Sequence, residues 1–449
     1  MEQKDKSEKK TMKIDVKYVT RVEGHGNIVV DVSDGTLKEC RFDVVEAPRF
    51  FEAMLRNRSI FEAQHITSRI CGICACGHTL ASIQAAEDAI GFTPSQQTEM
   101  LRELLLHQEI LDSHILHIYL LVAPDLLGMK SFVAMLPSHG DAVRRALRMK
   151  KCCNDICTTL AGRHVHPISC IVGGFTRLPS TEDLYDILNQ LYALMGDMEE
   201  TIRLFKTLKL PEFQRETEYV ALVSDGDEYP LLHGDLGSTD GMLLNKNDYR
   251  KLTNEFIVPH SSAKHARASR SSYMVGALAR FNLNSEKLGK EAKAVAGDLG
   301  MKPKVFNPFL NTAAQLVECV HSLEESVRIV KALLHKGVRQ EESVLVGLNE
   351  NSTLKVKAGK GVGAVEVPRG ILFHEYETDE KGTILNANCI IPTSQNVNNL
   401  EQDMKKLVPE ILEKSEEEMT QLLEMLVRAY DPCISCSAHI LDVKYVGKR

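Results

Sequence analysis

Two pairs of cysteines with Cys-x-x-Cys spacing lie near opposite ends of this 449-residue chain. The first pair is Cys71 and Cys74, and the second is Cys433 and Cys436. Four thiolates form a soft ligand set that suits zinc, copper(I), iron–sulfur clusters or nickel and iron. If the two pairs bind one metal site, the fold must bring together segments that almost the whole chain separates.

The composition is that of a globular protein without an export signal. Net charge is −7 with 26% charged residues, which argues against a nucleic-acid-binding surface. The first ten residues contain no apolar stretch, so they are not a secretory signal, and no window is apolar enough to span a bilayer. Twelve cysteines in such a chain indicate a reducing compartment, so we predict a cytoplasmic location and free thiols.

The residue pattern predicts a mainly α fold with β edges, of the α+β class. A hairpin is expected where a turn signal at Ser33–Thr36 separates two apolar runs. Apolar residues recurring every three or four positions predict the helices, with Ser95 as an N-cap. The expected helices are Phe51–Arg58, Thr79–Ile90, Gln96–Val122, Asp141–Leu160, Thr181–Leu208, Asn247–Phe256, Ser285–Asp298, Pro308–His335 and Leu400–Tyr430.

No linker or internal repeat divides the chain, so we predict a single domain at 13–439 after a disordered tail at 1–12. Its parts are a β-hairpin edge at 13–46, a large helical core at 47–210, an insertion and helices at 211–350, and a small sheet, a long helix and the second cysteine pair at 351–439. Within the insertion, Phe213–Asn245 is expected to be irregular or β.

The simplest interpretation of the cysteine pairs is a structural zinc site. Such pairs usually lie within a few tens of residues, because each stabilises a small local fold. Closure of a long loop is not forbidden, since its entropy grows only logarithmically. A chain of this size does not need a metal to fold, however, and the wide separation favours another explanation. The six cysteines without ligand spacing are expected to be packing residues: Cys40, Cys152, Cys153, Cys157, Cys170 and Cys319.

The residues around the cysteines, taken in order, resemble the large subunit of nickel–iron hydrogenases. The shared motifs are Arg69-x-Cys-Gly-x-Cys-x-x-x-His78, Asp431-Pro-Cys-x-x-Cys-x-x-His439, Arg21-Val-Glu23-Gly24-His25, Glu52, His166-Pro167, Gly173-Gly174, Tyr273–Arg280, Pro368-Arg369-Gly370 and Pro392-Thr393. The likeness covers nearly the whole chain. It is similar to the cytoplasmic, multi-partner branch, and most to the methyl-viologen-reducing type linked to heterodisulfide reductase.

The resemblance implies two metal sites. Cys71 and Cys433 would be terminal ligands of nickel, and Cys74 and Cys436 would bridge nickel and an iron that carries carbon monoxide and cyanide. Glu52 and His439, with the backbone carbonyl of Cys389, would bind magnesium. Magnesium prefers oxygen ligands, so the histidine in this set rests on the resemblance alone.

The resemblance also implies roles around the nickel–iron centre. Arg369 would polarise dihydrogen or donate to a cyanide, Glu23 would relay protons, and the sulfur of Cys436 would accept one. Thr393 would donate to a second cyanide, and Pro368 and Pro392 would line the pocket. His78 would donate to a cysteine sulfur. Outside these motifs, Arg369 would be read as a surface ion pair, Glu23 as solvated and Glu52 as an exposed helix residue.

The sequence departs from the family pattern at one position of the long helix after Cys74. Many members have an aspartate just before a histidine, but here Ser113 precedes His114, and Asp112 lies one residue earlier. One residue is a rotation of about 100° along a helix, so Asp112 cannot simply replace the aspartate that would accept a hydrogen bond from Arg369. Cys76 is an extra thiol, expected to pack or to be sensitive to oxidation.

The expected function is reversible heterolytic cleavage of dihydrogen. The chain has no further cysteine cluster for iron–sulfur ligation, so electrons would pass to an iron–sulfur small subunit, then to further electron-transfer subunits, heterodisulfide reductase among them. A maturation protease would remove 440–449. The alternatives are the structural zinc protein and a non-catalytic protein like the quinone-site subunit of respiratory complex I, which has lost its cysteines.

Overall fold

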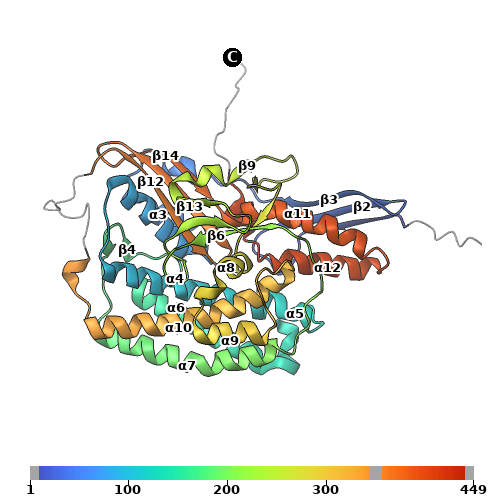
Figure 1. Cartoon of the computed structure of the whole chain (residues 1–449), viewed down its shortest axis with the longest axis horizontal. Helices are drawn as coiled ribbons and strands as arrows, with labels where there is room; N and C mark the ends of the chain where they lie inside the picture. Colours follow the sequence, from blue (N-terminus) through green and yellow to red (C-terminus); the bar gives the residue numbers. More distant parts are fainter. Residues whose placement is uncertain (1–9, 344–355, 440–449) are drawn as a thin grey trace, which may run out of the picture.

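Long helices form most of the fold, and several small sheets pack against them (Figure 1). The structure is a computed structural model that describes residues 10–343 and 356–439. The predicted tail at 440–449 and the first nine residues of the predicted N-terminal tail lie outside this range. The predicted α+β class, mainly α with β edges, is confirmed.

The α-helices of the described residues are α1 (Phe51–Leu55), α2 (Ala63–Thr67), α3 (Ala75–Ile90), α4 (Gln96–Leu116), α5 (Ala123–Leu126), α6 (Leu136–Ala161), α7 (Thr181–Phe205), α8 (Ala277–Asn284), α9 (Lys290–Asp298), α10 (Asn311–Lys336), α11 (Pro392–Glu410), α12 (Glu416–Ala429) and α13 (Ile434–Ser437). The strands are β1 (Met12–Val16), β2 (Gly26–Ser33), β3 (Thr36–Val44), β4 (Cys170–Ile171), β5 (Gly174–Phe175), β6 (Glu218–Val223), β7 (Asp235–Ser238), β8 (Leu243–Leu244), β9 (Asn254–Phe256), β10 (His265–Arg267), β11 (Tyr273–Met274), β12 (Gly359–Val367), β13 (Gly370–Thr378) and β14 (Ile384–Ile390).

The N-terminal sheet contains the predicted hairpin. Strands β2 and β3 are antiparallel, and Ser33 pairs with Thr36 across the turn. Asp34 and Gly35 both have positive φ, 52° and 70°, which a two-residue turn between twisted strands requires. Strand β1 adds to the other edge of β2, so the hairpin is part of a three-stranded sheet.

The helical core is built on α4, which contacts α6 and α10, while α7 covers the outer side of α10 and α6 (Figure 1). Helix α4 begins as predicted, because the Oγ of Ser95 accepts the backbone N–H of Thr98 at 3.1 Å. It ends earlier than predicted. At His117–Val122 the chain makes a wider π turn instead of continuing the α-helix.

A sheet of β12, β13 and β14 packs directly against the backbone of α3. Gly359, Gly361 and Gly363 lie two residues apart, so they occupy one face of β12. A Cβ added at Gly363 would lie 2.0 Å from the carbonyl oxygen of Ala81, closer than any real contact. Further along, the side chain of Val367 fills the space beside Gly77. The end of β12 therefore lies beside the first turn of α3.

Two helix predictions are wrong. The expected helix Leu400–Tyr430 is two helices: α11 contains Pro409 near its end, and Ser415 starts α12 with a capping box to Glu418. The expected helix Asn247–Phe256 is a short 3₁₀ segment followed by strand β9. Helix α8 lies in a segment for which no helix was predicted. It is buried on almost all sides, so it lacks the polar face on which the prediction relied.

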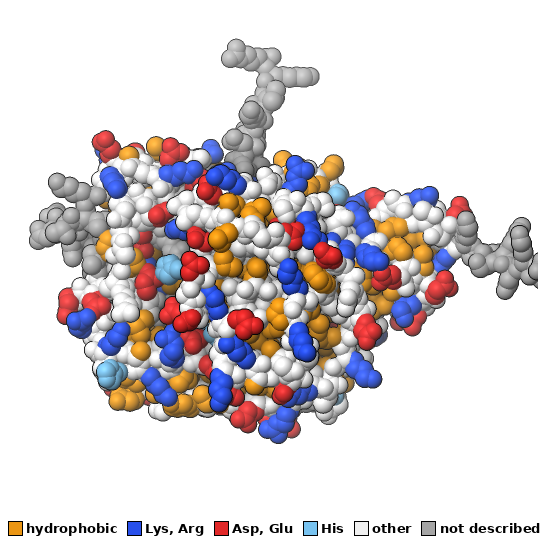
Figure 2. Space-filling view, in the orientation of Figure 1, with side chains coloured by type: hydrophobic (Ala, Val, Ile, Leu, Met, Phe, Trp, Pro, Cys, Tyr) orange, Lys and Arg blue, Asp and Glu red, His pale blue; other side chains and the backbone are white. Residues whose placement is uncertain are grey.

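The predicted β insertion forms a four-stranded sheet in the order β11-β6-β7-β8. The main hydrophobic core takes residues from both ends of the described chain, from Ile14 to Cys436. None of the described helices is long and apolar enough to cross a membrane. On the face shown in Figure 2, acidic and basic side chains are interspersed.

Because β12 and α3 are in direct contact, adding one methyl group at a glycine of β12 should destabilise the fold. We expect Gly363→Ala to lower the free energy of unfolding by about 1–3 kcal/mol, because the new Cβ clashes with backbone atoms that cannot move independently. The measurement is the thermal unfolding midpoint. The matched control is Gly196→Ala on the exposed side of α7, where a Cβ meets no atom within 4 Å and alanine favours the helix. Equal midpoints for the two variants would contradict the prediction.

Candidate metal centre

The fold brings the four predicted cysteines together. Cys71 and Cys74 lie just before α3, and Cys433 and Cys436 lie at α13. Their sulfur atoms all lie within 4.8 Å of one another, and the sulfurs of Cys71 and Cys433 are 3.7 Å apart. All four side chains are buried.

The C-terminal cysteine pair is held by backbone contacts with the N-terminal region. Glu23 and Cys433 form a parallel β-bridge, and the carbonyl of Glu23 accepts the N–H of Ile434 at 2.9 Å. A second bridge joins Arg49 and His439. The guanidinium of Arg49 donates to the carbonyls of Arg69, Ile70 and Ser435, so one side chain ties both cysteine segments together.

The four thiols fit a metal ion. Burial raises the pKa of the Cys71 thiol, but hydrogen bonds from Cys433, Cys436 and Cys74 outweigh it, so that pKa falls well below its ordinary value. A hydrogen bond with Cys436 raises the pKa of Cys433 well above its ordinary value. The cluster thus shares negative charge among crowded sulfurs. Metal binding would allow all four to become thiolates, since coordination deprotonates a thiol outright.

Arg369 lies at the tip of the hairpin between β12 and β13, where Pro368 and Arg369 connect Val367 to Gly370. Its Nε donates to the carbonyl of Asp431 at 2.6 Å and its Nη2 to the carboxylate of Asp431 at 2.8 Å. Burial lowers its pKa, but Asp431, followed by the cysteines, raises it above the ordinary value. The guanidinium is therefore a fixed positive charge beside the sulfurs.

Ser113 is the second partner of Arg369. Its hydroxyl oxygen accepts a hydrogen bond from Nη1 at 3.3 Å, at the position where the family pattern has an aspartate. Asp112 points elsewhere and pairs with Lys150 at 2.6 Å. The carboxylate partner of Arg369 is thus Asp431, which lies inside the second cysteine motif and whose role the sequence did not predict.

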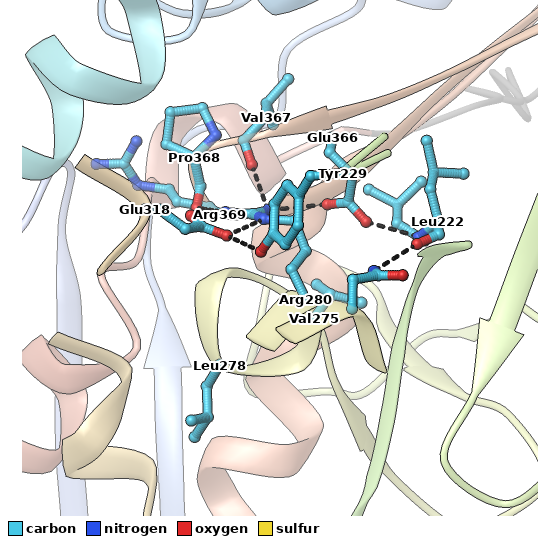
Figure 3. Close-up of polar contacts among 12 residues, drawn as sticks. Leu222, Tyr229, Val275, Leu278, Arg280, Glu318, Glu366, Val367, Pro368 and Arg369 are labelled. Atoms are coloured by element: carbon cyan, nitrogen blue, oxygen red, sulfur yellow. Dashed lines mark hydrogen bonds and ion pairs between the residues drawn. The ribbon is translucent and has the colours of Figure 1, made fainter. Parts of the chain in front are cut away.

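A buried ion-pair network holds the backbone behind Arg369 (Figure 3). Arg280 of α8 donates to both oxygens of Glu318, at 2.6 and 2.7 Å, and to Glu366 at 2.8 Å. The same guanidinium donates to the carbonyls of Val367 and Pro368. The sequence marked Arg280 only as part of a motif, and it offered no signal for Glu318 or Glu366.

The network carries excess negative charge next to one cation. Burial raises the pKa of Glu318, but Arg280 outweighs it, so that pKa falls below its ordinary value. Burial raises the pKa of Glu366 to about 7. Tyr229 donates its hydroxyl to Glu318 at 2.7 Å, and His114 contacts the other oxygen at 2.8 Å. His114 directly follows Ser113, so the network reaches Arg369 from two sides.

Glu23 lies at the edge of the centre and is half-buried. Its Oε2 accepts the backbone N–H of Ser435 at 3.1 Å, and its Oε1 accepts the Ser435 hydroxyl. Ser435 directly precedes Cys436. The predicted proton-relay carboxylate therefore lies one residue from a predicted ligand and also reaches towards solvent.

The other predicted pocket residues lie around the same cluster. Pro392 opens α11, and the hydroxyl oxygen of Thr393 accepts the N–H of Cys433 at 3.0 Å, which leaves its proton free to donate. His78 differs from the prediction. Its Nδ1 contacts Nε2 of His374 at 3.2 Å, and its Nε2 has no hydrogen-bond partner among the described residues. The expected hydrogen bond to a cysteine sulfur is thus absent.

Glu52 is in contact with Cys389, and the ring of His439 lies 6.0 Å from the ring of Phe51, the residue before Glu52. Oε1 of Glu52 accepts the N–H of Cys389 at 2.9 Å. Within the described chain, Oε2 of Glu52 and both ring nitrogens of His439 are buried without a hydrogen-bond partner. Burial raises the pKa of Glu52 and lowers the pKa of His439 to about 3. Buried polar atoms without partners are rare, so these residues fit a cation that would satisfy them.

Cys76 is separate from the four-cysteine cluster. A hydrogen bond with Cys157, together with burial, raises the pKa of Cys76 well above its ordinary value. Its side chain is buried, and it is not among the sulfurs that lie within 4.8 Å of one another. It is therefore a packing residue.

Two known families match this chain. A family described as nickel-dependent hydrogenase matches residues 49–145 and 245–439, which include all four cysteines and Arg369. A second family, described as HoxL-like, matches residues 13–47.

Several curated relatives cover almost the whole chain. The alpha subunit of sulfhydrogenase 1 from Pyrococcus furiosus is 32% identical over 95% of this chain and 98% of its own length. The matching subunit of the vhc F420-non-reducing hydrogenase from Methanococcus voltae is 28% identical over 96% of this chain and 95% of its own. Both relatives are hydrogenase subunits, and of these two the sulfhydrogenase subunit has the higher identity to this chain.

Solved structures share the fold. An NAD⁺-reducing [NiFe]-hydrogenase superposes with a TM-score of 0.85 at 25% identity, covering 95% of this chain and 99% of that chain. From the match of the family over most of the chain and the near full-length relatives, we conclude that this chain belongs to the nickel-dependent hydrogenase family.

Proposed function

We propose that this chain is a hydrogenase catalytic subunit that cleaves dihydrogen reversibly and heterolytically and passes electrons to an iron–sulfur partner subunit. The observation that carries the proposal is the cluster of four buried sulfurs within 4.8 Å with the guanidinium of Arg369 fixed beside it. A structural zinc site would not require a buried arginine held by two partners. The subunit of the complex I type has lost the cysteines that are present here.

The residues that would hold the nickel–iron centre are Cys71, Cys74, Cys433 and Cys436. When bound, the centre supplies an open metal position that polarises dihydrogen. Arg369 contributes a permanent positive charge that does not need to reorganise during the reaction, because Asp431 and Ser113 already hold it. Thr393 would offer its free hydroxyl proton to a cyanide, and Pro368 and Pro392 would line the pocket and exclude water.

The released proton would leave by the sulfur of Cys436 and the carboxylate of Glu23. The Ser435 hydroxyl bonded to Oε1 of Glu23 keeps that carboxylate oriented. Because Glu23 is half-buried, its other side can exchange the proton with water. General acid–base transfer needs hydrogen-bond reach, directly or through one water, and the contact of Glu23 with the backbone of the residue before Cys436 supports such a path.

The cofactor proposal includes carbon monoxide and cyanide on iron, and magnesium at Glu52, Cys389 and His439. The orphaned atoms of Glu52 and His439 support the magnesium. The partner proposal includes the iron–sulfur small subunit, further electron-transfer subunits with heterodisulfide reductase among the candidates, and a maturation protease acting on 440–449. The names of the relatives, which are subunits of hydrogenases, support a multi-subunit assembly.

Metal content tests the function. We expect Cys433→Ser to abolish nickel binding and to lower dihydrogen oxidation by more than about 100-fold, a larger loss than for residues that only orient ligands. Elemental analysis and infrared spectra of the purified complex measure the metals and the carbonyl and cyanide bands. Cys319→Ser on α10 changes a buried thiol outside the cluster and should keep both. Zinc alone in the wild-type complex would refute the proposal.

A lysine substitution separates the positive charge of Arg369 from the planar shape of its guanidinium group. Arg369→Lys keeps the charge but loses the fork that donates to Asp431 and Ser113. We expect kcat to fall by about 10²–10³, the range found for loss of one preorganised donor, while nickel content stays unchanged. Viologen-linked dihydrogen oxidation with metal analysis measures both. A variant with wild-type kcat would show that the held guanidinium is not needed.

Glu23 is expected to transfer protons without contributing to the binding of the metals. Glu23→Gln preserves the shape and the contact with Ser435 but cannot bind and release a proton at neutral pH. We expect turnover to fall by about 10²–10⁴ with nickel and infrared bands retained. The matched control is Glu46→Gln. Glu46 is another carboxylate of the N-terminal region, and it pairs with the exposed His25. Equal losses in the two variants would argue against a relay through Glu23.

A further inference from the structure

A second group of metal-ligating side chains lies apart from the four cysteines. It consists of His260 in the connection between β9 and β10, His265 at the start of β10, and Glu401 on α11. One ligand atom of each residue lies within 4.8 Å of the others. None of the three has a role in the function proposed above.

One ring nitrogen of His265 lacks the hydrogen-bond partner that a buried polar atom normally has. The residue is 2% exposed, yet its Nε2 is buried with no hydrogen-bond partner in the part of the chain that the structure describes. Buried polar atoms almost always have partners, and an exception in a folded protein points to a missing water or ion. Burial lowers the pKa of His265 to about 4, so the ring is neutral and can bind a metal.

Glu401 is already oriented towards the two histidines. Its Oε1 accepts the backbone N–H of Phe42 at 3.1 Å and contacts Nε2 of His260 at 2.8 Å. The rings of His260 and His265 lie 5.6 Å apart and nearly perpendicular. His260 has a side chain that is 24% exposed, which gives an ion a path from solvent to an otherwise buried site.

The neighbouring groups permit a cation. Lys405 Nζ lies 3.9 Å from Glu401 Oε2, but its side chain is 43% exposed and can turn towards water. Cys40 on β3 is near enough to feel the charges of Glu401 and Lys405, and burial raises its pKa to about 12. It is not among the ligand atoms within 4.8 Å. The ligand set is therefore two imidazoles and one carboxylate.

We propose that His260, His265 and Glu401 bind a divalent first-row transition ion, with Zn²⁺ as the best match, and that water completes its coordination. Two histidines and one glutamate form a known type of zinc ligand set, and imidazole with carboxylate also suits iron(II). The ion would join the β9–β10 hairpin to helix α11. Since α11 begins with Pro392 and Thr393 at the four-cysteine cluster, the ion would also anchor the middle of that helix, about two turns away.

The test is zinc binding by the assembled hydrogenase complex, purified without a polyhistidine tag. Samples are treated with a chelator, titrated with ZnCl₂ and analysed for zinc and nickel. We expect the wild type to bind one more zinc per chain than either His265→Gln or Glu401→Gln. In both variants the zinc affinity of the site should fall at least about 100-fold, which exceeds the loss typical of residues that only orient ligands. The control His233→Gln changes an exposed histidine that pairs with Glu99 and should behave as wild type.

A second measurement covers the case in which the buried variants do not fold. His260→Gln alters the partly exposed ligand. Because a ligand of the native state raises stability, zinc should raise the thermal midpoint of wild type and of His233→Gln but not of His260→Gln. Equal zinc binding and equal thermal shifts in wild type and His260→Gln would overturn the proposal, as would a wild type that binds no additional zinc.

Discussion

The direct contact between the backbones of β12 and α3 is the constraint on which the metal centre depends. Gly359, Gly361 and Gly363 let the strand lie on the helix without intervening side chains, and this fixes the register of the two elements. Because the register is fixed, the hairpin tip that carries Arg369 falls beside the start of α3, next to Cys74. Three residues without side chains therefore set the position of a charged group at the other end of the strand.

The ion pairs between buried charges near the sulfurs fix the positions of the side chains more than they raise the stability of the fold. Arg369 is held by Asp431, and Arg280 is held by Glu318 and Glu366. Such pairs add little net stability, because desolvation offsets the attraction, but loss of one partner costs about 3–5 kcal/mol. The arrangement therefore resists any rotation of the guanidinium groups. Arg280 also binds the carbonyl of Pro368, so the second network constrains the backbone that carries the first.

Local signals explain what the sequence predicted. The turn at Asp34 and Gly35 and the cap at Ser95 depend on neighbouring residues, and the order of the motifs selected the four cysteines, Glu23 and Arg369, which the fold places near one another. Contacts between distant segments could not be predicted in this way. Arg280, Glu318 and Glu366 come from three separate segments, and only the fold pairs them. The break before α12 was visible as the Ser415–Glu418 capping box, but the apolar periodicity on both sides concealed it.

The parallel bridge between Glu23 and Cys433 has a consequence for motion. Since the two backbones are hydrogen-bonded, thermal displacement of either segment carries the other with it. The separation between the carboxylate and the adjoining sulfurs then varies less than the separation of either from the surrounding helices. In the relay proposed for Glu23, proton transfer would depend steeply on the distance between donor and acceptor, so the bridge would keep the transfer rate uniform while the rest of the molecule fluctuates.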